Sequence, residues 1–201
     1  GADAKEVERG LKSESRIGEK AYLAPGPAIA GGTLLRDVTA LAALARGEGL
    51  FPAVIASNRA HAGWPYRKLR DILGTLRGKT VGVLGLAYKP GTDVVRRSSA
   101  VELCAALAAD GASVRAHDPK VTALPAAIAG KVASVWTMQD AWRGADALVV
   151  ATPWPEYRAI DAPTLAKQMR QPVVIDAFGA LAGGPGKDAR IRYFTVGAPA
   201  R

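Results

Sequence analysis

Apolar and polar residues follow one pattern before residue 78 and another after it. In the first part, apolar residues recur at helical spacing around an irregular stretch, whereas in the second part short apolar runs alternate with helical segments. Such alternation is typical of an α/β domain, in which helices cover both faces of a doubly wound parallel sheet. We therefore expect residues 1–76 to form a loop and a helical connector, and residues 77–201 to form the α/β domain.

The first part begins with a short helical pattern and continues with a loop. Val7 and Leu11 lie four residues apart among charged positions, which indicates the end of a helix with no strand before it. We therefore expect the chain to be part of a longer protein. Prolines and glycines recur from residue 16 onward, and they predict an ordered loop whose backbone N–H groups can approach a ligand.

Two helices should follow this loop and form the connector. Leu34, Val38 and Leu41 share helical spacing with other apolar residues, and glycines end the pattern beyond residue 46. A second helix should run from about residue 52 to residue 73, and Pro65 should kink or split it.

Short apolar runs place the strands of the second part. The first run, TVGVLGLAY, is almost continuously apolar, as in a parallel strand that is covered on both faces. The expected strands cover residues 80–88, 113–118, 132–136, 147–152 and 173–177, and the expected helices between them cover residues 100–109 and 162–169.

The charge of the chain favours anionic partners. Lysines and arginines number 27 against 18 acidic residues, which gives a net charge of +9. Nucleotides, nucleotide sugars and nucleic acid all fit this charge. The basic residues are scattered and aromatic residues make up only 6% of the chain, so a dedicated nucleic-acid surface has little support, and we expect no nucleic-acid partner.

The number of cysteines and the length of the apolar stretches indicate where in the cell the protein resides. Cys104 is the single cysteine, which excludes an internal disulfide and a cysteine-cluster metal site and fits a reducing cytoplasm. No apolar stretch approaches the roughly 18 residues of a membrane span, and the first residues are polar. We therefore expect a cytoplasmic protein without a bound metal or a membrane segment.

Glycines around the first strand suggest a phosphate site. Gly82 and Gly85 permit close approach of backbone to a phosphate, but the third glycine of the dinucleotide fingerprint is absent. These glycines are equally consistent with a turn that only packs strand against helix. Lys89 follows at the carboxyl end of the strand, where open α/β sheets bind ligands, and it favours a Rossmann-like nucleotide-binding domain.

The segment LGLAYKPGTDVVRRSS resembles the signature that opens the UDP-binding domain of the UDP-glucose/GDP-mannose dehydrogenase family. The Asp118-Pro119 pair after the second strand and Trp154, Glu156 and Tyr157 after a later one resemble further parts of that domain. Upstream, PGPAIAGGTLLRD resembles the family's substrate loop. The resemblance covers almost the whole chain, in the family's order.

This resemblance implies a portion of an NAD-dependent nucleotide-sugar 6-dehydrogenase. Family enzymes oxidise the sugar C6 alcohol to a carboxylate by two hydride transfers and hold the intermediate on a cysteine thiol. The domain that binds NAD is not among these residues. Counting back from Asp37 places Thr33 at the cysteine position, and another gap places Leu34 there, so neither alignment supplies a thiol. Cys104 lies in the other domain, and we expect it to be buried packing.

The resemblance assigns roles to individual residues, several of which have a plainer alternative. Arg16 would reach across a homodimer formed by the connector to the partner's UDP-sugar, or be a solvated loop arginine. Asp37 would assist proton movements, or be a carboxylate favoured at a helix start. Tyr88 and Lys89 would contact the substrate. Arg96 would belong to the same signature, or be an exposed charge. Asn58 lies where the family's central helix carries an asparagine, but a polar helix face explains it better.

Other positions depart from the family. Ala28 and Ala30 replace two loop glycines, and the family's Asp-Gly-Arg becomes Asp176-Ala177-Phe178, which removes a guanidinium that would contact the nucleotide. Two main hypotheses follow: the nucleotide-binding part of a dehydrogenase, or a catalytically inactive binding or assembly module. A basic nucleic-acid binder is a third and weaker one.

Overall fold

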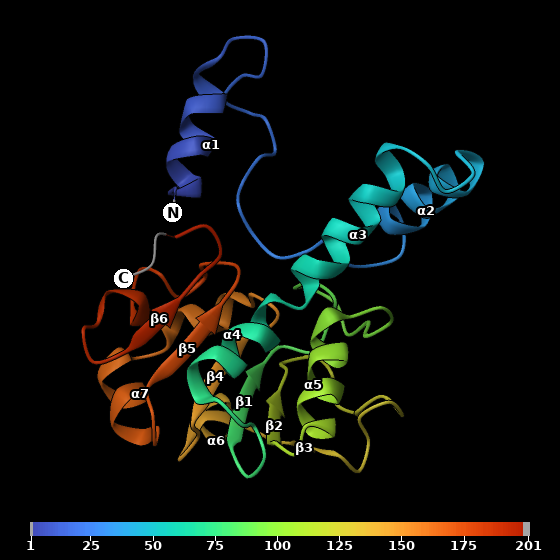
Figure 1. The fold of residues 1–201 in the computed structure, drawn as a ribbon. Coiled ribbons are helices and arrows are strands. Elements are labelled where there is room, and N and C mark those ends of the chain that lie inside the picture. The colour runs from blue at the N-terminus through green and yellow to red at the C-terminus, as the bar shows by residue number, and fades with distance from the viewer. Residues whose placement is uncertain (1, 199–201) are drawn as a thin grey trace.

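The sheet of the molecule has six parallel strands. The computed structural model describes residues 2–198 (Figure 1). Its strands run in the order β3-β2-β1-β4-β5-β6, the order typical of a Rossmann fold. Their bounds are β1 Thr80–Leu84, β2 Ser113–His117, β3 Val132–Ser134, β4 Ala147–Val150, β5 Val173–Asp176 and β6 Arg192–Phe194. The predicted α/β fold with a doubly wound parallel sheet is confirmed.

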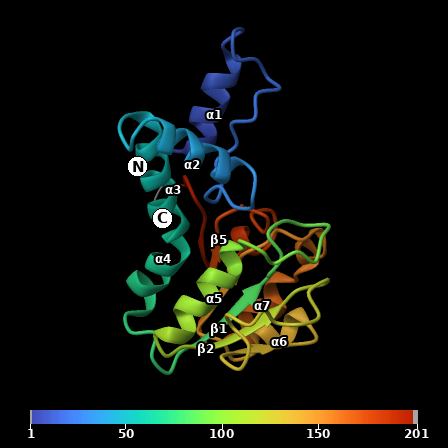
Figure 2. The same cartoon turned by 90° about the vertical axis from the view of Figure 1, so that its right-hand side faces the viewer.

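Helices cover both faces of this sheet. α4 and α5 lie on one face, and α6 and α7 lie on the other (Figure 2). The helices are α1 Ala4–Ser13, α2 Leu34–Leu44, α3 Leu50–Ala62, α4 Trp64–Leu73, α5 Ser99–Ala109, α6 Met138–Trp142 and α7 Ala162–Gln168, and two 3-10 turns are η1 Pro155–Ala159 and η2 Pro185–Lys187. None of the helices within residues 2–198 combines the length and the apolar content of a membrane span.

The order of connections reverses at β1. β1 pairs with β2 on one side and with β4 on the other, both in parallel register. All four residues of β4 are buried, as are Val81 and Val83 of β1, because helices cover both of their faces. A crevice at the carboxyl ends of β1 and β4 is where open sheets of this kind bind ligands.

β1 ends four residues earlier than the sequence predicted. Gly85 takes a φ of 94°, which turns the chain out of the strand, and its N–H donates to the carbonyl of His117 over 2.7 Å. A Cβ at this position would overlap Thr152, which follows β4. The predicted strand to residue 88 was therefore wrong at its end, because an apolar run does not reveal a left-handed turn.

The helical part divides between an arm and the sheet domain. α2 and α3 pack side by side and project from the body of the molecule (Figure 1). α3 ends before Gly63 and α4 begins at Trp64, with Pro65 in its first turn, so the predicted split is confirmed. α4 packs against α5 and β5, and its Leu69 is fully buried. A domain boundary after residue 76 remains a prediction.

α1 stands apart from the arm and points away from the sheet (Figure 1). The N–H of Ala4 at its start donates to the carbonyl of Gly197 over 2.7 Å. A long connection without regular structure then leads from α1 to α2, as the glycines and prolines predicted.

We expect Gly85→Ala to lower the free energy of unfolding by about 3 kcal/mol or more. The cost of a left-handed backbone for alanine adds to the cost of an overlap between its Cβ and buried Thr152. Gly130→Ala is the matched control, because Gly130 has a φ of 73° but open space around it, and it should lose only about 1–2 kcal/mol. Urea unfolding measures both variants. Equal losses would show that the contact with Thr152 is not tight.

Candidate functional site

The candidate site lies at the carboxyl edge of the sheet, where two distant segments meet. A Cβ on Gly31, whose φ is 86°, would lie 3.3 Å from the Tyr88 ring. Arg97 Nη1 donates to the carbonyl of Gly32 over 3.3 Å. The turn that precedes Thr33 is thus in contact with the loop that follows β1.

Asn58 and His61 of α3 fix the segment ahead of this turn. The Asn58 side chain accepts from the N–H of Ile29 over 2.7 Å and donates to the carbonyl of the same residue over 3.1 Å. His61 Nε2 lies 2.8 Å from the Gly26 carbonyl oxygen. The interpretation of Asn58 as a polar helix face was therefore wrong, because its amide matches both backbone groups of the loop. The loop is ordered by the arm that follows it.

The loop between β1 and α5 carries the cationic side chains. Lys89 is exposed, and its Nζ lies 5.5 Å from the centre of the Tyr88 ring. Arg96 is exposed, and Arg97 adopts a φ of 55°, which is unusual for a residue with a side chain. Guanidinium and ammonium groups placed together on one loop suit an oligophosphate. Sequence reasoning selected Lys89 and Arg96 but not Arg97, although Arg97 belongs to the same signature segment.

Thr33 and Asp37 lie at the start of α2. Thr33 is the N-terminal cap residue, and its carbonyl accepts from the N–H of Asp37 over 3.0 Å. Asp37 is exposed and pairs with Arg36 over 3.0 Å. The placement fits both a carboxylate at a helix start and a group beside the candidate site, and the catalytic role of Asp37 remains a prediction.

Arg16 lies in the connection after α1. It pairs with Glu14, with 3.0 Å between Nε and Oε1, and the bond lowers the pKa of that carboxyl. The Arg16 side chain is 87% exposed, which leaves it accessible to a second molecule. Its reach into a partner's site remains a prediction.

Cys104 is part of the core. Its side chain is fully buried in α5, and burial raises the pKa of the thiol to about 12. The prediction of a packing role is confirmed. Since Cys104 is the single cysteine of the chain, this segment offers no thiolate to a substrate.

Asp176 begins the tripeptide that departs from the family pattern. It is fully buried at the end of β5 and accepts from the Tyr193 hydroxyl over 2.7 Å and from the Leu181 N–H over 2.8 Å. Phe178 is half-buried, and its N–H donates to the same carboxylate over 3.1 Å. This aspartate therefore shapes the turn after β5.

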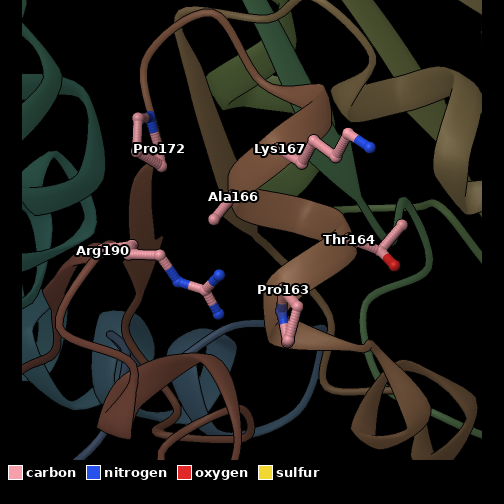
Figure 3. A pocket seen from close by; sticks show the side chains of 6 residues that line it. All are labelled: Pro163, Thr164, Ala166, Lys167, Pro172 and Arg190. Atoms are coloured by element: carbon pink, nitrogen blue, oxygen red, sulfur yellow. The ribbon is translucent and has the colours of Figure 1, made fainter.

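A groove of about 390 Å³ lies elsewhere on the surface, beside α7 (Figure 3). It is lined by Pro163, Thr164, Ala166, Lys167, Pro172 and Arg190. Arg190 is engaged by Asp188, with 2.6 Å between Nη2 and Oδ2. None of the residues selected from the sequence borders this groove, and we do not assign the site to it.

Family profiles match most of the chain. The UDP-glucose/GDP-mannose dehydrogenase family, UDP binding domain, matches residues 82–183, and the central domain of the same family matches residues 1–61. The match to the UDP-binding domain begins within β1 and includes the whole loop from Tyr88 to Arg97.

Individual relatives agree with these profiles. UDP-glucose 6-dehydrogenase TuaD of Bacillus subtilis is 33% identical over 205 residues, which are the whole of this chain and 44% of that protein. UDP-glucose 6-dehydrogenase AglM of Haloferax volcanii is 39% identical over 180 residues, 88% of this chain and 41% of that protein. The chain thus spans less than half the length of these relatives.

Solved structures support the same fold. A UDP-glucose dehydrogenase from Pyrobaculum islandicum is 31% identical with a TM-score of 0.75, covering 96% of this chain and 42% of that one. An NDP-N-acetyl-D-galactosaminuronic acid dehydrogenase from Methanosarcina mazei has a TM-score of 0.78 at 24% identity, covering 98% of this chain and 44% of that one.

We expect the Cys104 thiol to resist a disulfide reagent in the folded chain at pH 8, because it is buried and remains protonated far below a pKa of about 12. Absorbance after addition of the reagent, with and without urea, measures the reaction. One thiol should react promptly on unfolding. Prompt reaction of the folded chain would contradict the buried placement.

Proposed function

Because the chain belongs to the UDP-glucose/GDP-mannose dehydrogenase family, we propose that it is the nucleotide-binding and dimer-forming part of an NAD-dependent nucleotide-sugar 6-dehydrogenase. The family resemblance implies that NAD is held by the remainder of a longer protein, which accords with the share of the relatives that this chain spans. Its own task is to bind the UDP part of the substrate.

The observation that carries this proposal is the junction of two family elements at the sheet's carboxyl edge. Gly31 meets Tyr88, and Arg97 holds the Gly32 carbonyl, so the substrate loop borders the loop of the UDP-binding domain. Uracil and ribose lie at this edge. The diphosphate lies against Lys89 and Arg96, and the sugar extends towards Thr33.

Two further roles complete the proposal. Arg16, free of the body of its own subunit, meets the UDP-sugar of the partner subunit. Asp37, with an ordered water, assists the proton movement that accompanies hydride transfer to NAD in the complete protein. The segment described here lacks the NAD domain and does not turn over by itself.

We expect the chain to bind UDP with micromolar affinity, more tightly than GDP-mannose, and Lys89→Ala to weaken UDP binding by about tenfold through loss of a charge contact. Titration calorimetry at two salt concentrations measures this. Lys131→Ala is the matched control, since Lys131 is also exposed but precedes β3 at the opposite edge. A folded chain that binds no uridine nucleotide would refute the proposal.

A catalytically inactive module is the second candidate. It is favoured by Thr33 at the cysteine position and by Phe178 in place of a nucleotide-contacting arginine. A threonine hydroxyl ionises far above neutral pH and needs a strong base beside it to act as a nucleophile. The two candidates differ in one outcome: the full-length enzyme forms NADH from NAD and UDP-glucose, whereas a module binds UDP without forming NADH.

The dimer part of the proposal rests on the arm. α2 exposes Leu34, Leu41 and Leu44, the last at 81%, and Leu50 at the start of α3 is 71% exposed. Leucines gathered on a projecting pair of helices are costly to leave in water and suit a second copy of the same surface.

We expect the chain to sediment as a dimer and the double variant Leu41→Glu, Leu44→Glu to sediment as a folded monomer, because these side chains are exposed in the single chain. Its thermal stability should fall only by the contribution of the dimer. Trp136→Glu is the control, since Trp136 is 97% exposed beyond β3. Sedimentation velocity distinguishes the species. A dimer that survives the double substitution would place the interface elsewhere.

A further inference from the structure

The peptide segment Leu86–Ala87, which leads from β1 into the candidate site, is tied at all four of its backbone polar groups. Both residues are 1% exposed. Their N–H groups donate to one carboxylate oxygen of Asp118, over 2.6 Å and 3.0 Å. Their carbonyls accept from the hydroxyls of Ser98 and Thr152, each over 2.6 Å. Asp118 follows β2, Thr152 follows β4 and Ser98 precedes α5, so the three side chains come from three separate segments.

Asp118 receives further donors at the same place. Trp154 Nε1 donates to Oδ2 over 3.1 Å, and the N–H groups of Lys120 and Val121 donate to Oδ1 over 2.8 Å and 3.0 Å. Burial alone would raise the pKa of Asp118, but four backbone donors outweigh it and lower the pKa, so the group is an anion at neutral pH. The half-buried carboxylate of Asp118 thus occupies the N–H groups of the first βα turn.

This arrangement changes how the domain can hold phosphate. In a Rossmann domain, the first βα turn is where backbone N–H groups meet a pyrophosphate. Here the N–H groups of Leu86 and Ala87 are already paired with Asp118, so a phosphate cannot take them. The cationic side chains further along the same loop, Lys89 and Arg96, remain available to it.

We propose that Asp118 and Thr152 are positioning residues, which fix Leu86–Ala87 and thereby hold Tyr88 and Lys89 in the orientation that the nucleotide diphosphate requires. The inference rests on the proposed function and adds to it the source of phosphate recognition, which is side chains and not turn amides. Ser98 completes the clamp, and because it also caps α5 it is less suited to substitution.

A matched control exists at the opposite edge of the sheet. Asp146 is 1% exposed and accepts from the Thr80 N–H over 2.9 Å and from Arg170 over 3.2 Å. It ties the start of β1 as Asp118 ties its end. If Asp118 had only a structural role, variants of Asp118 and Asp146 with equal losses of stability would bind UDP equally well.

The test compares Thr152→Val, Asp118→Asn and Asp146→Asn in the 201-residue chain, with thermal unfolding and UDP titration for each. Thr152→Val keeps the shape but removes the hydroxyl. Thr152→Val and Asp118→Asn should weaken UDP binding by about tenfold. Thr152→Ser keeps the hydroxyl and should bind UDP as the parent chain does. Asp146→Asn should lower thermal stability without a loss of affinity. If the loss of UDP affinity were proportional to the loss of thermal stability in all variants, the proposal would be overturned.

Hydrogen exchange separates this inference from the proposed function. Thr152→Val should speed amide exchange in residues 86–97 and leave β5 protected, whether or not UDP is present. If the parent chain binds no UDP yet the loop loosens in this way, the proposed function fails and the clamp stands. Unchanged exchange in residues 86–97 would overturn the clamp itself.

Discussion

Asp118 brings a negative charge to the end of β2, and the chain surrounds it with five N–H donors from three segments. Asp118 is half-buried, so it loses part of its hydration, and these five hydrogen bonds compensate for that loss. The exit from β1, the turn after β2 and the residue that opens η1 are therefore fixed relative to one another. The candidate site is built on this fixed base, because Tyr88 and Lys89 follow directly from the segment that Asp118 holds.

The second constraint is the close approach between β1 and β4. Gly85 leaves no room for a side chain beside Thr152, and the Thr152 hydroxyl in turn holds the Ala87 carbonyl. The contact between Gly85 and Thr152 thus lies where β1 ends, and it sets the direction of the loop that follows. Across the edge, Gly31 and Arg97 connect this loop to the segment before α2, which Asn58 anchors to the arm. The candidate site and the arm of α2 and α3 are thus connected through a short series of backbone contacts.

Apolar runs predicted most strands of this fold, because strands that are buried on both faces, such as β4, are apolar throughout. Pro65 predicted the break between α3 and α4. Periodicity missed β6 and α6, which have three and five residues and carry too few positions for a period to show. The candidate site was selected from family motifs, yet the contacts that assemble it were not foreseeable. Arg97, Asn58 and Thr152 act on the backbone of residues distant in sequence, and no local pattern marks such partners.

The carboxyl edge between the loop from Leu86 to Arg97 and the turn before Thr33 is the proposed uridine nucleotide site. Titration of the isotopically labelled chain with UDP, followed through the amide chemical shifts, shows which residues the nucleotide affects. We expect saturable shift changes concentrated in residues 29–37 and 85–97. Changes confined to α7 and the neighbouring groove, or no changes at all in a folded sample, would contradict it.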